Sequence, residues 1–140
     1  MTIHSRVVSL IEQIGRMMKE HVCDIDAEEC KLTVNQVMVL HLLDARDRLA
    51  MADIAQSLHI TPASATSLVN RMVDSGWLDR SGDPDDRRKV WVSIHPDRKE
   101  SVIKRKEQHR LKMQEFNSVL SEDQLKQLAD ILQVLVDRNS

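Results

Sequence analysis

The 140-residue chain has little of what β-rich, secreted or membrane-spanning proteins need. It contains no Tyr, one Phe, two Trp, three Gly and three Pro, so few residues can form the turns of an all-β fold. Two Cys residues cannot build a disulfide framework. No apolar run approaches the ~20 residues that cross a bilayer, and residues 1–20 mix charged with apolar side chains, unlike a signal peptide. We therefore expect one mainly α-helical chain in the cytoplasm, without a membrane partner.

The formal net charge of −2 does not by itself suggest a nucleic-acid partner, but the charge is unevenly spread. Residues 1–30 carry three Lys or Arg against six Asp or Glu, whereas residues 96–112 carry seven against three. A cationic cluster at residues 87–89 can meet phosphate groups whatever the total charge. The distribution of charge is thus compatible with binding to nucleic acid.

Apolar residues at helical spacing predict long helices at both ends of the chain. In residues 1–22 they recur at steps of three and four and cover a face too wide for a lone surface helix. Residues 97–138 predict two more such helices, the second capped by Ser121. Leaving these faces in water would cost about 1.5–3 kcal/mol for each Leu, Ile or Val. We therefore expect residues 1–31 and 96–140 to form a dimerisation region in which two copies intertwine.

Residues 32–95 begin with three predicted helices. The first starts at a capping box formed by Thr33 and Gln36, and its nearly continuous apolar stretch must be buried. A short helix over residues 51–58 is followed by a three-residue turn and a third helix that Thr61 caps. Two helices joined by such a turn are typical of a helix-turn-helix motif.

The third helix has one apolar face and one face of small hydrogen-bonding residues, among them Ser67 and Asn70. Gly76 ends this helix, because the left-handed backbone at that position favours glycine. Two strands follow, at residues 77–80 and 90–94, around a turn that ends in basic residues. A hairpin in this place makes the motif a winged one, and we predict that residues 32–95 are the DNA-binding domain.

Five strings carry a family resemblance: Leu32-Thr33…Gln36…Leu40, Ile54-Ala55…Leu58, Ser64-Ala65-Thr66-Ser67-Leu68-Val69-Asn70-Arg71-Met72-Val73, Gly76-Trp77-Leu78…Arg80 and Asp83-Pro84-Asp85-Asp86-Arg87-Arg88-Lys89-Val90. Together they resemble the MarR family of bacterial transcription regulators, closely over residues 32–95 and in layout only over the flanking helices. The resemblance implies a winged helix-turn-helix homodimer on double-stranded DNA. Such proteins are often repressors, and they are often released by small phenolic or anionic ligands or by oxidation. Two reading helices roughly 34 Å apart would fit a pseudo-palindromic operator.

Carried over by position, the resemblance places the third helix in the major groove and the hairpin tip in the minor groove. Asp85 would orient the Arg87 guanidinium for narrow A·T tracts, where the negative potential is enhanced. The predicted DNA-binding residues are Thr61, Ser64, Thr66, Ser67, Asn70, Arg71, Asp85, Arg87, Arg88 and Lys89. One departure follows the hairpin, where His95-Pro96 replaces part of the usual Leu-Thr-x-x-Gly, although His95 can still cap a helix weakly.

Other functions fit the sequence less well. A dimeric protein-interaction module would use the same helices. A redox-responsive relative would use Cys23 and Cys30, and a metal-responsive one would hold zinc with His21 and Cys23, Glu20 or Asp24, and His41 or His109. Acidic neighbours disfavour the thiolates, and metal-ligand spacings such as Cys-x-x-Cys are absent. No nucleophile turn or glycine-rich phosphate loop suggests an enzyme. We predict no catalytic residues, metal or cofactor, and an effector whose identity and binding residues are unassigned.

Overall fold

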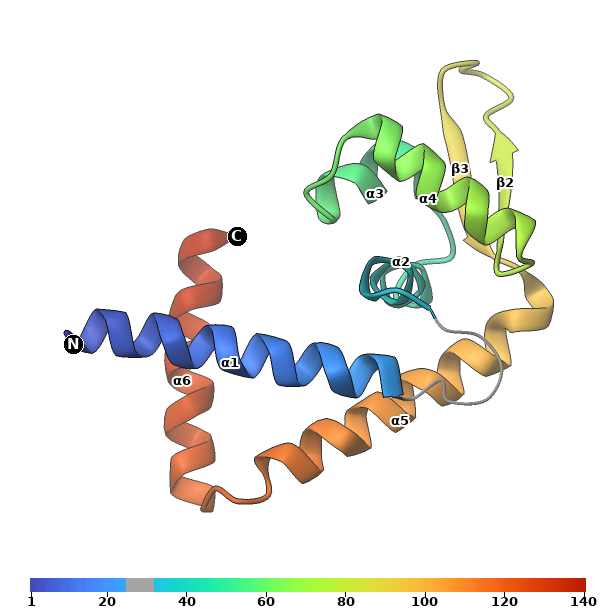
Figure 1. The fold of residues 1–140 in the computed structure, drawn as a ribbon. Helices are drawn as coiled ribbons and strands as arrows, with labels where there is room; N and C mark the ends of the chain where they lie inside the picture. Colours follow the sequence, from blue (N-terminus) through green and yellow to red (C-terminus); the bar gives the residue numbers. More distant parts are fainter. Residues whose placement is uncertain (25–31) are drawn as a thin grey trace.

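The computed structural model describes residues 1–24 and 32–140, and this part of the chain contains six α-helices and one three-stranded sheet (Figure 1). In chain order the elements are α1 (Ile3–Asp24), α2 (Val34–Asp44), β1 (Leu49–Ala50), α3 (Met51–Ser57), α4 (Pro62–Asp74), β2 (Leu78–Gly82), β3 (Val90–Ile94), the 3-10 helix η1 (Pro96–Arg98), α5 (Lys99–Asn117) and α6 (Glu122–Asn139). The prediction of a mainly α-helical chain is confirmed. Helices α3 and α4 and the β2–β3 hairpin lie where the sequence predicts the winged motif.

The helix boundaries follow from their caps. Thr33 and Ser121 each accept a hydrogen bond from the backbone N–H three residues on, and a Gln at that position bonds back, so both predicted capping boxes are present. Gly76 has a φ of 80°, the left-handed conformation expected of the residue that stops α4. One end was predicted wrongly: α1 continues to Asp24, whereas the sequence predicted a loop from Cys23. The last turn of a helix needs no apolar residue, so periodicity alone misses it.

The sheet has the antiparallel order β1-β3-β2, and its first strand was not predicted. We expected a hairpin of two strands, and the structure adds Leu49–Ala50, which pairs with Val92 and Trp91 of β3. A two-residue strand has no alternation to detect, so only its pairing reveals it. The predicted return strand, residues 90–94, is confirmed, whereas the outgoing strand runs from Leu78 to Gly82, two residues beyond the prediction.

One apolar core holds the winged region together. Its members come from α2, α3, α4, the sheet and the first turns of α5. The largest fully buried side chains are Leu40, Ile54, Met72, Leu78, Val39, Val69, Val92 and Val102. Because Val102 belongs to α5, this helix is anchored on the winged region at its beginning, and its direction is set there.

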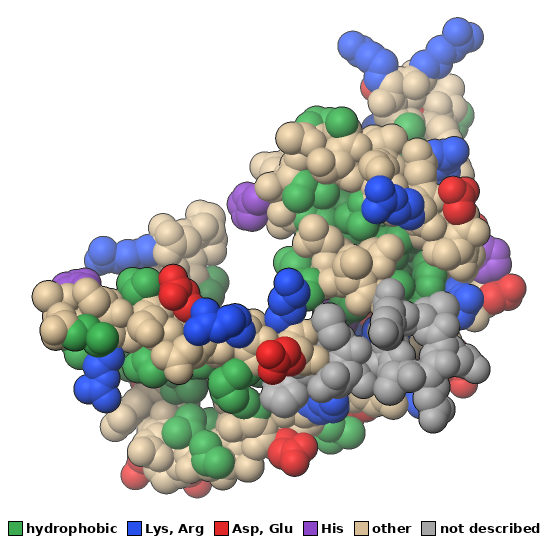
Figure 2. Space-filling model, in the orientation of Figure 1, with side chains coloured by type: hydrophobic (Ala, Val, Ile, Leu, Met, Phe, Trp, Pro, Cys, Tyr) green, Lys and Arg blue, Asp and Glu red, His purple; other side chains and the backbone are tan. Residues whose placement is uncertain are grey.

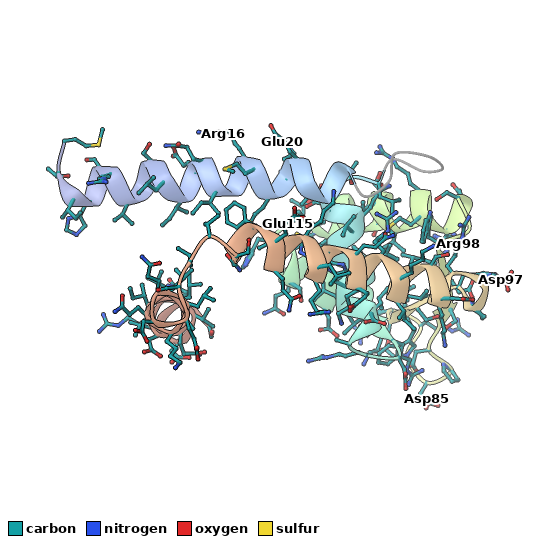
Figure 3. The ribbon with its side chains drawn as sticks, turned by 90° about the horizontal axis from the view of Figure 1, so that it is seen from below. Arg16, Glu20, Asp85, Asp97, Arg98 and Glu115 are labelled. Atoms are coloured by element: carbon teal, nitrogen blue, oxygen red, sulfur yellow. The ribbon has the colours of Figure 1, made fainter. Side chains whose placement is uncertain are left out.

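The rest of α5, with α1 and α6, extends away from that core (Figure 1). Apolar side chains on α1 and α6 remain exposed, and Figure 2 shows many of them on the face of this arm. In Figure 3 α6 is seen end-on and stands apart from α1 and α5. None of the helices in the described ranges combines the length and the apolar character needed to span a membrane.

Candidate nucleic-acid interface

Helix α4 is fixed at its first turn and along its apolar side. The Thr61 hydroxyl oxygen accepts a hydrogen bond from the Ser64 backbone N–H at 3.1 Å, and the same hydroxyl donates to the Ser64 side chain at 2.9 Å. Ala65, Val69 and Met72 are completely buried against the core. Since buried residues recur at helical spacing on one side, the opposite side of α4 is held outward.

The sequence-predicted residues of α4 lie on or beside that outward side. Thr61, Ser64, Thr66, Ser67 and Arg71 are exposed, and Asn70 is half-buried. The Thr66 hydroxyl donates a hydrogen bond to the Pro62 carbonyl oxygen at 3.0 Å, which leaves the hydroxyl oxygen available as an acceptor. The structure therefore brings the six predicted helix residues onto one short polar surface.

Asn70 has a partner that the sequence did not reveal. The Nη1 group of Arg80, on β2, donates a hydrogen bond to the Oδ1 atom of Asn70. The bond joins the outward side of α4 to the hairpin across ten positions in sequence. The sequence prediction placed Asn70 at base edges and used Arg80 only for the family resemblance. Nothing in the spacing of the two residues indicates their contact.

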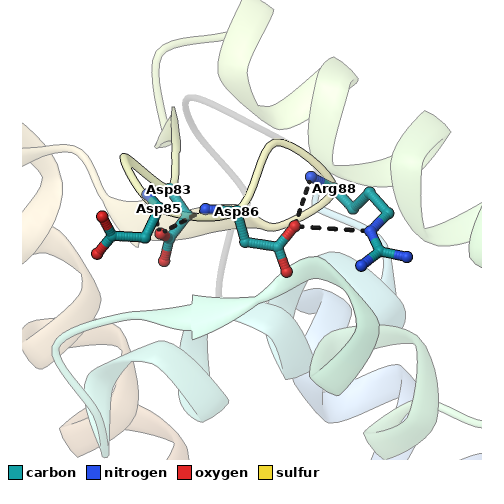
Figure 4. Close-up of polar contacts among 4 residues, drawn as sticks. All are labelled: Asp83, Asp85, Asp86 and Arg88. Carbon is teal, nitrogen blue, oxygen red and sulfur yellow. Dashed lines mark hydrogen bonds and ion pairs between the residues drawn. The ribbon is translucent and has the colours of Figure 1, made fainter.

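The hairpin tip is organised around Asp83. Its Oδ1 atom accepts hydrogen bonds from the backbone N–H groups of Asp85 at 2.8 Å and Asp86 at 3.2 Å (Figure 4). Its Oδ2 atom accepts a hydrogen bond from Trp91 Nε1 at 2.9 Å. The backbone N–H of Asp85, followed by the indole of Trp91, holds the pKa of Asp83 below its usual value. A carboxylate that stays ionised keeps accepting all three bonds, so the turn has a defined shape.

The charged side chains of the tip pair differently from the prediction. Asp86 accepts a hydrogen bond from the Arg88 backbone N–H at 3.0 Å and lies 3.7 Å from Arg88 Nε (Figure 4). Within the described ranges, no hydrogen bond or ion pair joins Asp85 to Arg87. The expected orientation of Arg87 by Asp85 is therefore not present in the unbound chain. The turn directs the carboxylate of Asp86, rather than that of Asp85, toward a guanidinium.

Trp91, near the tip of the hairpin, has two cations over its indole ring. The Arg48 guanidinium lies 3.9 Å from the centre of the indole ring, and Lys89 Nζ lies 4.4 Å from it. Arg48 precedes β1, which pairs with β3, so a residue far away in the sequence joins the basic hairpin. The sequence prediction missed Arg48 because the strand that places it there was not predicted.

The β2–β3 hairpin thus forms a positively charged projection beside the polar side of α4. Arg87, Arg88 and Lys89 are exposed at the end of the hairpin, which extends past α4 (Figure 1). Figure 2 shows Lys and Arg side chains projecting from this end of the molecule. Helix α4 supplies hydrogen-bond donors and acceptors, and the hairpin supplies positive charge. This is the combination that readout of base edges and binding of phosphates require.

The corner after the hairpin agrees with the weak cap expected there. His95 Nδ1 accepts a hydrogen bond from the Asp97 backbone N–H at 3.2 Å, and so caps the 3-10 helix η1. The imidazole also lies 3.9 Å from a carboxylate oxygen of Asp79. The chain thus turns into α5 without the Leu-Thr-x-x-Gly string.

Two histidines meet where α2 packs on α5. The rings of His41 and His109 have their centres 5.8 Å apart, and His41 Nε2 is buried without a hydrogen-bond partner among the described residues. Burial, followed by the charges of His109 and Lys106, lowers the pKa of His41 below 6.5. The described residues contain no group of three or more potential metal ligands. The side chains of His21 and Cys23, and the whole of Cys30, lie outside the described residues.

Comparisons with known proteins agree with this arrangement. A model of the MarR family matches residues 32–90. The HTH-type transcriptional regulator YfiV of Bacillus subtilis is 28% identical over 104 residues, which cover 74% of this chain and only 65% of that relative. A point mutant of MarR from E. coli superposes with a TM-score of 0.77 at 18% identity, over 97% of both chains.

The same mutant, crystallised with operator DNA, is similar with a TM-score of 0.69 and 21% identity, over 94% of this chain and 91% of that one. At such identities the solved structures establish the fold, and the family match covers the winged region that contains α4 and the hairpin. Residues 32–90 thus match the MarR family of transcription regulators, and the described part of the chain has the fold of solved MarR structures.

Proposed function

We propose that the protein is a repressor that binds a pseudo-palindromic operator in double-stranded DNA as a homodimer and is released by a small-molecule effector. The observation that carries this proposal is the exposed polar side of α4 next to a hairpin with three successive cations at its end. A complex of a structurally similar MarR protein with operator DNA supports the choice of ligand.

Helix α4 has the dimensions and chemistry of a major-groove reader. Its outward side presents short hydroxyl and amide groups, so the backbone of the helix can come close to the base edges. Ser64, Ser67 and Asn70 are proposed to face bases. Arg71, exposed at the border of this surface, is proposed to contact the phosphate backbone.

The hairpin is proposed to enter the neighbouring minor groove with Arg87. This guanidinium has no ion-pair partner in the described part of the chain, so it can bind DNA without first breaking a contact. Arg88 and Lys89, and also Arg48 beside the Trp91 ring, are proposed to meet phosphates. The turn around Asp83 fixes the direction in which these cations project.

Dimerisation is proposed to cover the exposed apolar residues of the arm. On α1 these include Ile3, Val8 and Ile11, which are 68%, 55% and 57% exposed, and on α6 Ile131 and Leu135 are 60% and 49% exposed. Residues 1–31 and 96–140 would then form the shared region, and residues 32–95 of each copy a reading head. Two heads related by a two-fold axis match the two halves of a pseudo-palindrome.

The decisive experiment selects duplexes from a random pool with the purified protein, and then measures affinity for the selected sequence against salt concentration. We expect an inverted repeat that is bound in the nanomolar range and is lost steeply as salt rises, because phosphate contacts release counterions. Candidate phenolic and anionic compounds, added to the complex, test release by an effector. A repressor in the cytoplasm without catalytic activity should turn over none of them.

Arg87→Ala tests the role of the hairpin against a matched loss of charge, Arg138→Ala, at the exposed end of α6. We expect the first variant to lose about tenfold or more in affinity, mostly at A·T-rich flanks, and the second to bind like the parent. Equal binding by the Arg87→Ala variant and the parent would show that the hairpin does not enter the groove. A parent protein that ignores every duplex at low salt would rule out the whole proposal.

A further inference from the structure

The contact between Arg80 and Asn70 lies in the angle between α4 and the hairpin. Arg80 pairs with Val92 in the β2–β3 ladder, and Val92 is completely buried. Side chains alternate along a strand, so Arg80 is on the same face of β2 as buried Leu78, the face that α4 covers. Arg80 is nevertheless exposed, because it lies where this covered face ends. Its guanidinium reaches α4 at Asn70.

The chemistry of the contact fixes the orientation of the Asn70 amide. A guanidinium has N–H donors and no acceptor, whereas a side-chain amide has one accepting oxygen and one donating NH2 group. Only the Oδ1 atom of Asn70 can therefore face Arg80. The Nδ2 group is on the other branch of the amide, and no described residue accepts a hydrogen bond from it.

Apart from its bond to Asn70, the Arg80 side chain makes no hydrogen bond with the described residues. It forms no ion pair there, although the acidic residue Asp79 is its neighbour in sequence. A guanidinium without a carboxylate partner is free to remain on the amide of Asn70. The amide itself belongs to the polar surface that is proposed to read bases.

We propose that Arg80 is a positioning residue that determines sequence specificity by holding the oxygen of Asn70 on the hairpin side of α4, so that Asn70 meets bases through its NH2 group alone. This inference rests on the proposed binding of DNA by α4. An Asn that reads adenine in the bidentate way needs both amide branches on one base edge, to accept from N6 and to donate to N7. The bond to Arg80 withdraws the oxygen from that edge. Asn70 therefore reads acceptor atoms, such as N7 and O6 of guanine or O4 of thymine.

The experiment compares base preferences, which a loss of charge alone does not change. Duplexes are selected from a random pool with the parent, Arg80→Ala, Arg80→Lys and the double variant Asn70→Ala/Arg80→Ala, with Asn70→Ala as its reference. We expect Arg80→Ala to raise the relative affinity for adenine at one position in each half-site by about fivefold or more. The reason is that the Asn70 amide can then pair with both N6 and N7 of that adenine. Arg80→Lys keeps a donor and should retain the parental preference.

Two comparisons separate this role from simpler ones. Arg71→Ala removes a charge from the same neighbourhood and should weaken binding to all duplexes while the preference profile stays that of the parent. In the Asn70→Ala background, removal of Arg80 should add no further change of preference, because the two residues act as one unit. Thermal unfolding confirms that each variant is folded, and Arg80→Met, which keeps the length of the side chain without a donor, replaces Arg80→Ala if the latter is not.

A uniform loss of affinity in Arg80→Ala, with the parental base preferences, would overturn the inference and make Arg80 a phosphate contact. A change of preference that persists without Asn70 would overturn it as well. Both results leave the proposed function intact. Failure of the parent to select any duplex would instead remove the proposed function, and this inference with it.

Discussion

The winged region and the arm, which consists of α1, α6 and the rest of α5, differ in how far their apolar side chains are buried. In residues 32–102 apolar side chains from four helices and all three strands meet, and Leu40, Ile54 and Met72 are completely buried within a single chain. In α6 every described side chain is exposed except the half-buried Leu128, although the helix is as clearly amphipathic as α4. An apolar face thus indicates that something covers it, and only the fold tells whether the cover comes from the same chain.

Truncation of the core should have the largest effect on stability. Met72→Ala removes a fully buried side chain between α4 and its neighbours and should lower the free energy of unfolding by about 2–5 kcal/mol. Chemical denaturation measures this change, which should be the same at all protein concentrations. Met38→Ala makes the same truncation at an exposed position of α2 and should cost well under about 1 kcal/mol. Similar losses in both variants would contradict the assignment of Met72 to the core and of Met38 to the surface.

A charge in the arm should act through assembly instead. Leu135→Glu on α6 would bury a carboxylate in the proposed dimer and should raise the dimer dissociation constant by about a hundredfold or more. Sedimentation over a range of concentrations measures the change. Gln127→Glu introduces the same charge at an exposed polar position of α6 and is the matched control. A Leu135→Glu protein that remains dimeric, or a parent that is monomeric, would assign the apolar arm to another partner.

Loss of one hydrogen bond should loosen the hairpin more modestly. Trp91→Phe keeps an aromatic ring for Arg48 and Lys89 but removes the N–H group that donates a hydrogen bond to Asp83. Loss of this bond should lower the free energy of unfolding by about 1 kcal/mol. Hydrogen exchange at the Asp85 and Asp86 amides, which donate to Asp83, should become faster. The Gly76 amide, bonded to Val73, is the internal control. Unchanged exchange at the tip would mean that the backbone alone holds the turn.

The junction of the two regions should show the smallest effect, as a dependence on pH. His41 has a lowered pKa in the folded protein because of burial and of the charges of His109, Lys106 and Arg105, which outweigh Asp44. Between that lowered pKa and 6.5 the unfolded chain binds more protons at this site than the folded one. Stability should therefore fall as the pH falls through 6.5 and level off below the folded pKa.

Denaturation at several pH values tests this with two variants. His41→Gln should flatten the dependence between pH 7 and the lower plateau, because glutamine does not titrate. His4→Gln, at an exposed position near the start of α1, should leave it as in the parent. An unchanged slope in the His41→Gln variant would show that protonation of this imidazole is not what couples pH to folding.

The elements with strong local signals were predictable from sequence. The capping boxes at Thr33 and Ser121, the Thr61 cap and the left-handed Gly76 each depend on residues a few positions apart. The strands of the hairpin were predictable within two residues for a similar reason, since β-branched and aromatic residues surround a dense turn. The polar surface of α4 followed from the helical period alone.

The parts that escaped prediction depend on contacts between distant segments. Strand β1 exists because two residues pair with β3, and this pairing brings Arg48 onto Trp91. The bond of Arg80 to Asn70 needs the crossing of α4 over the hairpin. The choice of Asp86 over Asp85 as the partner of a guanidinium depends on the backbone path of the turn, which Asp83 holds.

Local sequence was enough to specify where most helices begin and end, which of their sides are apolar and where the cations gather, because capping, periodicity and composition act within a few residues. The folded arrangement set which apolar sides are buried in one chain and which stay exposed, and it set which side chains contact Asn70 and Trp91. Those outcomes depend on the free energy of packing between segments far apart in the chain, and no local pattern of residues contains that information.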